Sequence, residues 1–269
     1  MIGEFVWTGY DYLGEPTPYD EYWPSRSSYF GICDLAGLPK DRYWLYRSKW
    51  NKEQHTIHLL PHWSWGKERQ GKVTPVYCYT DYPSGELFVN GKSQGRITKD
   101  PTSRLDRYRL RWNHVKYEPG EIKVIVYDAD GNAAGEQILK TAGAPSALHL
   151  AAWTELTGTV LSEFCDENSL RTVPMSSLAF ITVSLTDSEG TLIPQADDQL
   201  TFEVSGAGTF EAVCNGDATS LESFKAPTMK LFNGQLVVIV RSAQEPGILT
   251  LKVTDAQRGL SNTIDIKVE

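Results

Sequence analysis

Short runs of alternating apolar and polar residues fill the chain from about residue 67 to residue 141. Turn signals separate the runs, and this arrangement is typical of antiparallel strands. The expected strands lie at residues 73–79, 86–89, 122–127 and 136–140. We interpret residues 62–141 as a small β-sandwich of immunoglobulin-like type.

Two local features favour this sandwich. Asn90-Gly91 follows the run at residues 86–89, and this dipeptide tolerates the positive φ angles that a tight hairpin turn requires. A later stretch alternates arginines with apolar residues: Arg107, Tyr108, Arg109, Leu110, Arg111 and Trp112. The alternation predicts a strand with one basic face and one apolar face.

A second group of alternating runs predicts a second sandwich. Residues 142–146 (AGAPS) have the small, Pro- and Gly-containing composition of a linker between domains. Residues 147–269 are expected to form another immunoglobulin-like β-sandwich. Its expected strands lie at residues 180–186, 199–204, 235–241, 248–254 and 262–268.

The first 61 residues follow another pattern. Residues 2–7 are a short apolar run that predicts a strand, and residues 8–26 read as a polar, aromatic loop. Residues 40–50 have helical spacing, with Pro39 suited to a first turn. One strand, one loop and one helix cannot cover both faces of the strand, so this segment is expected to belong to something larger.

Composition and charge limit the partners. The 269 residues are 41% hydrophobic and 22% charged, which is ordinary for a globular protein. A formal charge of −8 gives no attraction to phosphate or anionic lipid, so neither nucleic acid nor a membrane is expected as a partner. No apolar run is long enough to span a membrane, no signal peptide is expected after Met1, and homo-oligomerisation stays open.

Aromatic residues are concentrated near the N-terminus. Six of the eight tryptophans and seven of the thirteen tyrosines lie within residues 1–65. They predict either a large aromatic core or a surface that stacks on the apolar faces of sugars. The two interpretations can hold for different rings.

Cysteines and histidines predict no metal site and no cofactor. The four cysteines show no C-x-x-C spacing, and whether Cys165 and Cys214 pair stays open. His55, His58 and His62 could in principle hold zinc. Their spacing across an extended segment does not suit one face, so we interpret them as packed histidines.

Several long stretches together resemble the C-terminal region of glycoside hydrolase family 2, and more closely its β-galactosidase-like branch. The likeness begins at residues 3–19 (GEFVWTGYDYLGEPTPY) and 23–37 (WPSRSSYFGICDLAG). It continues at residues 39–43, 58–63, 86–93, 215–217, 219–220 and 222–226. Cys214 and Ala218 depart from the family pattern, in which we expect Asp and Pro at these two positions.

The resemblance implies the last β/α unit of a (β/α)8 barrel at residues 1–61, followed by two accessory sandwiches. Trp7 matches the tryptophan that ends the eighth barrel strand, at the floor of the sugar pocket. Because barrel enzymes build their sites at the C-terminal ends of strands, the loop after Trp7 is expected to face the substrate. The candidate substrate-binding residues are Trp7, Asp11, Tyr12, Trp23 and Arg26.

No catalytic residue is assigned in this chain. The resemblance implies a retaining mechanism, which needs two carboxylates about 5–5.5 Å apart. It places the nucleophile upstream of residue 1 and the acid/base after an Asn, but no Asn-Glu dipeptide occurs here. The chain alone is therefore expected to be inactive.

Three functions are compared. The favoured one is the C-terminal part of a retaining glycoside hydrolase acting on β-galactosides or related glycans, which binds carbohydrate through a parent protein located in the periplasm or outside the cell. The alternatives are a carbohydrate-binding module and a structural or adhesive pair of sandwiches. Coplanar exposed aromatic rings would favour the module, and barrel strands upstream would favour the hydrolase.

Overall fold

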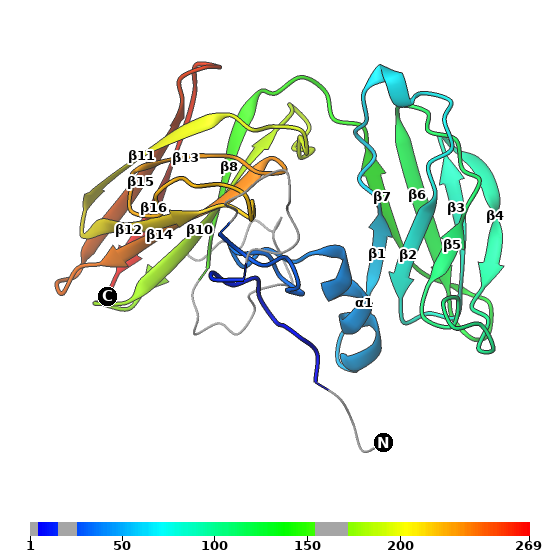
Figure 1. Ribbon diagram of the computed structural model, residues 1–269. Helices are drawn as coiled ribbons and strands as arrows, with labels where there is room; N and C mark the ends of the chain where they lie inside the picture. The colour runs from blue at the N-terminus through cyan, green and yellow to red at the C-terminus, as the bar shows by residue number, and fades with distance from the viewer. Residues whose placement is uncertain (1–4, 16–25, 154–171) are drawn as a thin grey trace. The chain divides into compact units, whose positions relative to one another are not determined.

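The computed structural model describes residues 5–15, 26–153 and 172–269, which fall into two compact units. The first sandwich unit is Pro39–Ala142. The second sandwich unit combines Gly143–Glu269 with the N-terminal residues Met1–Leu38. Almost all regular structure in both units is β-strand, which confirms the mainly β fold class predicted from the sequence (Figure 1).

The first sandwich unit consists of two antiparallel sheets and one helix. The three-stranded sheet has the order β1-β2-β5 and the four-stranded sheet the order β4-β3-β6-β7. The elements are α1 (Asp41–Trp50), β1 (Ile57–Leu60), the short 3₁₀ helix η2 (Lys67–Arg69), β2 (Val76–Thr80), β3 (Ser84–Val89), β4 (Lys92–Thr98), β5 (Leu110–Trp112), β6 (Glu121–Tyr127) and β7 (Ala133–Lys140).

The core of this unit follows the alternation seen in the sequence. In β6, Ile122, Val124 and Val126 are buried and their neighbours are partly exposed. Leu110 and Trp112 of β5 are buried as well. Each sheet therefore turns one apolar face into the core, which burial of apolar surface stabilises.

The hairpin predicted at Asn90-Gly91 is confirmed. β3 and β4 pair antiparallel on either side of it. Asn90 and Gly91 have φ angles of 48° and 76°, in the left-handed region that Gly and Asn adopt most easily.

The helix predicted at residues 40–50 is also confirmed, as α1. It lies beside β1 of its own unit (Figure 1). The Trp44 ring of the helix stacks on His58 of β1 with 5.0 Å between ring centroids. Helix α1 has 10 residues, and no helix in the described ranges is long and apolar enough to cross a bilayer.

The strand predicted at residues 2–7 is wrong for the part that the structure describes. Phe5, Val6 and Trp7 form no strand, and Phe5 is fully exposed. A strand requires a neighbour for its backbone N–H and C=O groups, and no described segment pairs with these residues.

The second sandwich unit has one four-stranded and one five-stranded sheet. Their orders are β12-β14-β10-β8 and β13-β11-β15-β16-β9, antiparallel except for the β16–β9 pair. The strands are β8 (Ala147–Trp153), β9 (Thr172–Val173), β10 (Leu178–Thr186), β11 (Gln199–Gly206), β12 (Gly208–Cys214), β13 (Thr228–Lys230), β14 (Gln235–Ser242), β15 (Gly247–Asp255) and β16 (Leu260–Val268).

The five strands predicted for this sandwich correspond to β10, β11, β14, β15 and β16. Strands β8, β9, β12 and β13 were not predicted. The segment expected to be a linker is fastened to the sandwich, because Gly143 N–H donates to Asp187 Oδ2 at 2.7 Å and Ser146 N–H donates to the Thr186 carbonyl at 2.9 Å.

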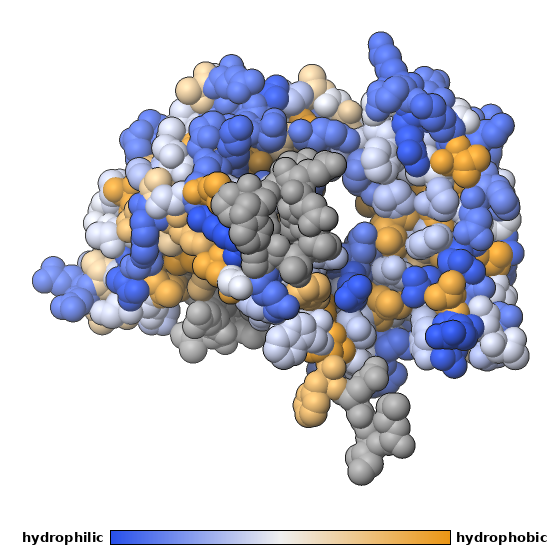
Figure 2. Space-filling view, in the orientation of Figure 1, coloured by the Kyte–Doolittle hydropathy of each residue, from blue (hydrophilic) through white to orange (hydrophobic). Residues whose placement is uncertain are grey.

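Surface hydropathy agrees with this core assignment. On the face shown in Figure 2, hydrophilic residues cover most of the first sandwich unit, with hydrophobic residues scattered among them. The largest fully buried side chains lie inside the sandwiches and include Trp63, Tyr117, Leu185, Leu236 and Leu251.

Candidate functional site

The N-terminal segment, residues 5–15 and 26–38, folds back on itself. Residues 8–14 run beside residues 26–33, and backbone hydrogen bonds of 2.9–3.1 Å join the two stretches. The bonds connect Ile32 N–H to Thr8 O, Cys33 N–H to Gly9 O, Asp11 N–H to Cys33 O, Ser28 N–H to Tyr12 O and Gly14 N–H to Arg26 O. The described residues of the loop predicted after Trp7 are thus held by backbone hydrogen bonds without forming regular strands.

Asp11 stabilises the inside of this segment. Its side chain is buried, and Oδ1 accepts a hydrogen bond of 2.7 Å from Gly31 N–H. A Cβ at Gly31 would overlap the backbone of Tyr10 and Asp11, so only glycine fits there. The carboxylate therefore holds the two stretches together at a point of close backbone approach.

Trp7 and Tyr12 lie together on the surface. The Trp7 indole N–H donates to Tyr12 Oη at 3.1 Å, and the rings meet edge to face with centroids 6.1 Å apart. Tyr12 Oη donates in turn to Glu15 Oε2. The hydrogen bond to the Glu15 carboxylate raises the pKa of Tyr12, so the phenol keeps its proton at neutral pH.

Aromatic and aliphatic side chains around this pair are exposed. Trp7 is 71% exposed, which rules out burial in the core of the described structure. Phe5, Tyr10, Leu13 and Tyr29 of the same segment are exposed as well. The segment therefore presents several large apolar side chains to solvent.

Arg26 points toward the second sandwich. Its guanidinium carbon lies 4.2 Å from the centre of the Phe224 ring, and Nη2 donates to the Glu222 carbonyl. Its backbone N–H donates to the Ala218 carbonyl at 3.2 Å. Arg26 therefore ties the N-terminal segment to the loop at residues 215–226.

Asp34 makes the second connection to this loop. Oδ1 accepts hydrogen bonds from Ala36 N–H at 2.9 Å and Leu38 N–H at 2.8 Å, which fixes the carboxylate. Oδ2 lies so close to Gly216 that a Cβ on this glycine would overlap it. The two stretches that carry the resemblance, far apart in sequence, therefore meet in space.

The two departures from the family pattern also lie at this contact. Burial and the nearby Asp34 raise the pKa of the Cys214 thiol to about 12, so Cys214 places no charge beside that carboxylate. Ala218 contributes its backbone carbonyl to Arg26. Proline would retain the same carbonyl, so Ala218 leaves this bond intact.

A groove of about 580 Å³ opens beside the same loop. Its lining comes from the second sandwich unit: Asp197, Gln199, Asn215, Asp217, Ser220, Glu222, Lys230, Leu231 and Phe232. The sequence analysis selected none of these residues for binding. The motif at residues 215–217 was the available signal, because it belongs to the stretches that carry the resemblance.

The five predicted substrate-binding residues take different positions. Trp7 and Tyr12 are joined by a hydrogen bond, Asp11 is buried within the segment, and Arg26 faces the second sandwich. Trp23 lies outside the described residues. Their contact with substrate stays a prediction.

The three histidines considered for zinc have separate partners. His55 Nδ1 contacts Asp81 Oδ2 at 2.5 Å, and His58 Nε2 contacts Asp41 Oδ1 at 2.9 Å. His62 packs on Trp65, and burial lowers its pKa. Within the described ranges, no three His, Cys, Asp or Glu side chains are grouped to hold a metal ion. Cys165, whose pairing with Cys214 the sequence leaves open, lies outside those ranges.

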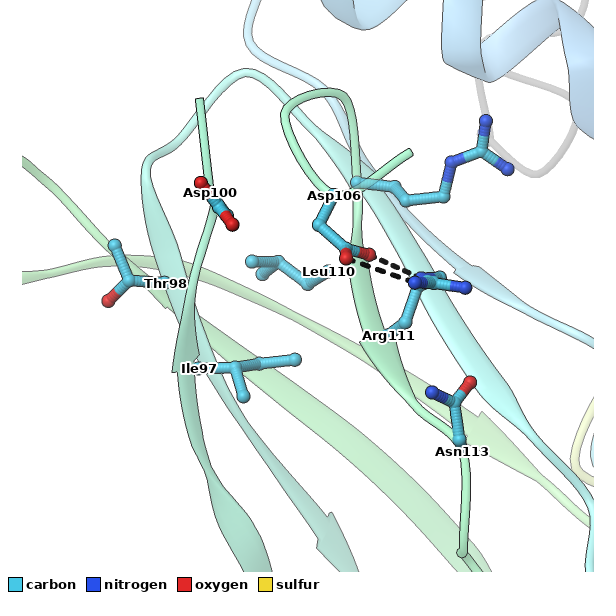
Figure 3. Close-up of a pocket in the computed structure, with 8 residues that line it drawn as sticks. Ile97, Thr98, Asp100, Asp106, Leu110, Arg111 and Asn113 are labelled. Carbon is cyan, nitrogen blue, oxygen red and sulfur yellow. Dashed lines mark hydrogen bonds and ion pairs between the residues drawn. The ribbon is translucent and has the colours of Figure 1, made fainter. Parts of the chain in front are cut away.

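A smaller pocket of about 200 Å³ lies in the first sandwich unit, between β4 and β5. Asp106 and Arg111 both line it, and Figure 3 shows them pointing toward each other. Arg111 Nη2 donates to Asp106 Oδ2 at 3.0 Å. This ion pair lowers the pKa of Asp106. The Asp106 carboxylate and the Arg111 guanidinium bond each other, and this pair ties the loop before β5 to the strand.

Comparisons with known proteins cover nearly the whole chain. Residues 166–263 match the family described as glycoside hydrolase family 2 C-terminal domain 5, and residues 71–135 match a domain of unknown function, DUF4982. The chain is 41% identical to the β-galactosidase BoGH2A of Bacteroides ovatus over 98% of its own length and 28% of that protein. It is 29% identical to a putative β-glucuronidase of Formosa agariphila over 91% of its own length and 22% of that protein.

Solved structures agree with the sequence matches. A β-glycosidase from Bacteroides vulgatus superimposes with a TM-score of 0.82 at 32% identity, covering 99% of this chain and 31% of that one. The chain thus spans about a third or less of the relatives it matches.

The fold and these matches define a pair of β-sandwich units of the kind that forms the C-terminal domains of family 2 proteins. The chain belongs to glycoside hydrolase family 2 and corresponds to the C-terminal part of a β-galactosidase-like member.

Proposed function

We propose that this chain is the C-terminal part of a retaining glycoside hydrolase that cleaves β-galactosides or related glycans. The 41% identity to a β-galactosidase over nearly the whole chain supports the substrate class. The observation that carries the proposal is the docking of the N-terminal segment onto the loop at residues 215–226, with Trp7 exposed and hydrogen-bonded to Tyr12 on that segment.

In this proposal, residues 1–61 supply the last β/α unit of a (β/α)8 barrel in the longer protein, and Trp7 forms part of the sugar pocket. Neighbouring barrel strands there give residues 2–7 the backbone partners that no described segment of this chain provides. The exposed indole ring can stack on the apolar face of a pyranose, which needs a fixed ring orientation. Tyr12 fixes that orientation by accepting the indole hydrogen bond. The second sandwich acts at a distance from the reaction, because Arg26 and Asp34 hold the segment that carries Trp7.

The two catalytic carboxylates belong to the remainder of the longer protein. General acid/base catalysis alone contributes about 10²- to 10⁴-fold, and a covalent nucleophile contributes more. The 269-residue chain is therefore expected to give no hydrolysis.

The test uses the chain and the longer protein side by side. Aryl β-galactoside and aryl β-glucuronide are offered to both, and the anomeric form of the first product is followed by NMR. We expect turnover of the galactoside by the longer protein only, with retention of configuration. Turnover by the 269-residue chain, inversion, or preference for the glucuronide would each contradict the proposal.

A further inference from the structure

The groove beside residues 215–222 has the size and composition of a ligand site. Its volume of about 580 Å³ lies within the roughly 300–1,000 Å³ typical of small-molecule sites. The same loop accepts hydrogen bonds from Arg26 through the carbonyls of Ala218 and Glu222. The groove therefore shares a wall with the structure that supports Trp7.

Polar side chains in the groove are fixed before any ligand arrives. Glu222 Oε2 accepts from Lys230 N–H at 3.2 Å, and its Oε1 accepts from Gln199 Nε2 at 3.1 Å. Asn215 is buried, donates to the Lys230 carbonyl at 2.9 Å and accepts from Asp217 N–H at 3.2 Å. Fixed groups lose little conformational entropy on binding.

The chemistry of these groups suits hydroxyl-rich ligands. Carboxylates accept hydrogen bonds, and side-chain amides both donate and accept them, as pairs of sugar hydroxyls require. Asp217 Oδ1 is held by Thr219 N–H at 2.8 Å, which orients the carboxylate. The partly buried Phe232 ring adds an aromatic surface for the C–H face of a sugar ring.

Charge selects among such ligands. The groove has three carboxylates, Asp197, Asp217 and Glu222, and one cation, Lys230. The part of the chain outside residues 39–142, to which the groove belongs, is also acidic, with 22 Asp and Glu against 8 Lys and Arg. Residues 39–142 have the opposite balance, with 12 Asp and Glu against 18 Lys and Arg. Uronate or sulfate groups would be repelled there, while neutral sugars would not.

We propose that this groove is a distal subsite for neutral glycans, in which the second sandwich holds sugar units remote from the cleaved bond. The inference rests on the proposed hydrolase function and narrows it to uncharged substrates. Binding energy from remote sugar units favours catalysis when it positions the reacting unit.

The test is a binding titration of the 269-residue chain, followed by amide NMR. The probes are a neutral β-linked galactotetraose and the same tetrasaccharide oxidised at C6 to uronate. We expect saturable shifts at Gln199 and Asn215 with the neutral probe, and binding of the oxidised probe weaker by about tenfold or more at low salt. The difference is expected to shrink as salt screens the carboxylates.

Variants locate the site. Gln199→Ala and Phe232→Ala should each raise Kd for the neutral probe about three- to tenfold, as expected for loss of one hydrogen bond or one ring contact. Asp197→Asn, at an exposed position, should strengthen binding of the oxidised probe. Asn113→Ala in the first sandwich unit is the matched control and should change nothing. Because Gln199 is exposed, its variant remains informative even where Phe232→Ala fails to fold.

The experiments distinguish failure of the subsite proposal from failure of the proposed hydrolase function. Absence of saturable shifts, unchanged Kd in the Gln199→Ala variant, or tighter binding of the oxidised probe would overturn the subsite, even if the longer protein cleaves β-galactosides. Binding as expected by the chain, with no galactoside cleavage by the longer protein, would instead overturn the proposed function.

Discussion

The guanidinium of Arg26 lies over the ring of Phe224, with 4.2 Å between the guanidinium carbon and the ring centre. The contact joins the N-terminal segment to a loop almost 200 positions later in the chain. Because Arg26 also donates to the Glu222 carbonyl, its charge is shared between an aromatic face and a backbone oxygen. The second sandwich therefore determines where the segment with Trp7 lies.

Arg26→Ala is expected to loosen this segment without unfolding the sandwich. The lost ring contact is worth about 0.5–2 kcal/mol and the charged hydrogen bond about 1.5–3 kcal/mol, and the two contributions do not simply add. Amide exchange of residues 8–14 and 26–33, measured by mass spectrometry, should become at least about tenfold faster. Arg104→Ala, at an exposed site of the first sandwich unit, is the control. Unchanged protection of residues 8–14 would show that Arg26 is not the anchor.

Gly216→Ala should weaken the same contact by steric overlap. A Cβ there would overlap Asp34 Oδ2 and lie 2.7 Å from Asp34 Cγ. Asp34 cannot move away easily, because Ala36 and Leu38 N–H groups hold its other oxygen. Overpacking of this kind typically costs about 1–3 kcal/mol, which thermal unfolding of the variant should reveal. Gly9→Ala meets no atom within 4 Å and is expected to unfold like the wild type. Equal melting temperatures for the two variants would show that Gly216 does not lie in close contact with Asp34.

The first sandwich unit should become more stable as pH rises past 8. Burial, and secondarily the ammonium of Lys49, lowers the pKa of Lys99 to about 8, while Asp81 opposes this shift. Lysine in the unfolded chain titrates near about 10.4, so between pH 8 and 10 the unfolded state binds more protons and stability increases with pH. Because Lys99 is only partly buried, the expected gain from pH 7.5 to 9 is about 1 kcal/mol.

Lys99→Met isolates this effect. Burial raises the pKa of the Cys78 thiol to about 12, which lowers stability above the ordinary thiol pKa and so opposes the Lys99 effect in the wild type. Cys78 is present in both proteins, so the effect of its burial is common to them, and the difference between them retains only the Lys99 effect and its coupling to the Cys78 thiol. Urea unfolding at pH 7.5, 8.25 and 9 should show wild-type stability rising relative to Lys99→Met. A difference that is flat or falls with pH would contradict the assignment.

Sequence patterns predicted the regular parts of this fold because those parts depend on local alternation. β6, β10, α1 and the Asn90-Gly91 hairpin each have a period or turn signal in their own residues. β12 was missed since its burial does not alternate cleanly and it contains a register shift between Phe210 and Ala212. The run at residues 2–7 has strand composition, but composition supplies no neighbouring strand.

The candidate site was predictable only in part, for a similar reason. The resemblance selected Trp7 and Tyr12, and the structure brings these two together. No local pattern indicates that Arg26 reaches Phe224 or that Asp34 abuts Gly216, because both contacts depend on how distant segments fold. The groove lining could not be predicted for the same reason, since its residues come from three separate stretches of the second sandwich unit.

Tyr12→Phe should release the Trp7 indole while leaving the ring contact in place. Phenylalanine offers no acceptor for the indole N–H, and it also loses the bond to Glu15. In the 269-residue chain, the indole resonance of Trp7, assigned by its absence in Trp7→Phe, should shift and exchange faster with water. In the longer protein, loss of one neutral hydrogen bond predicts a fall in kcat/KM of about two- to tenfold, and Trp7→Ala a larger fall with retention unchanged. Glu15→Gln is the discriminating control: it retains the Tyr12 hydroxyl as acceptor, so the indole resonance should stay near its wild-type position while the pKa of Tyr12 falls. If Tyr12→Phe behaves like the wild type in both assays, Tyr12 does not position Trp7.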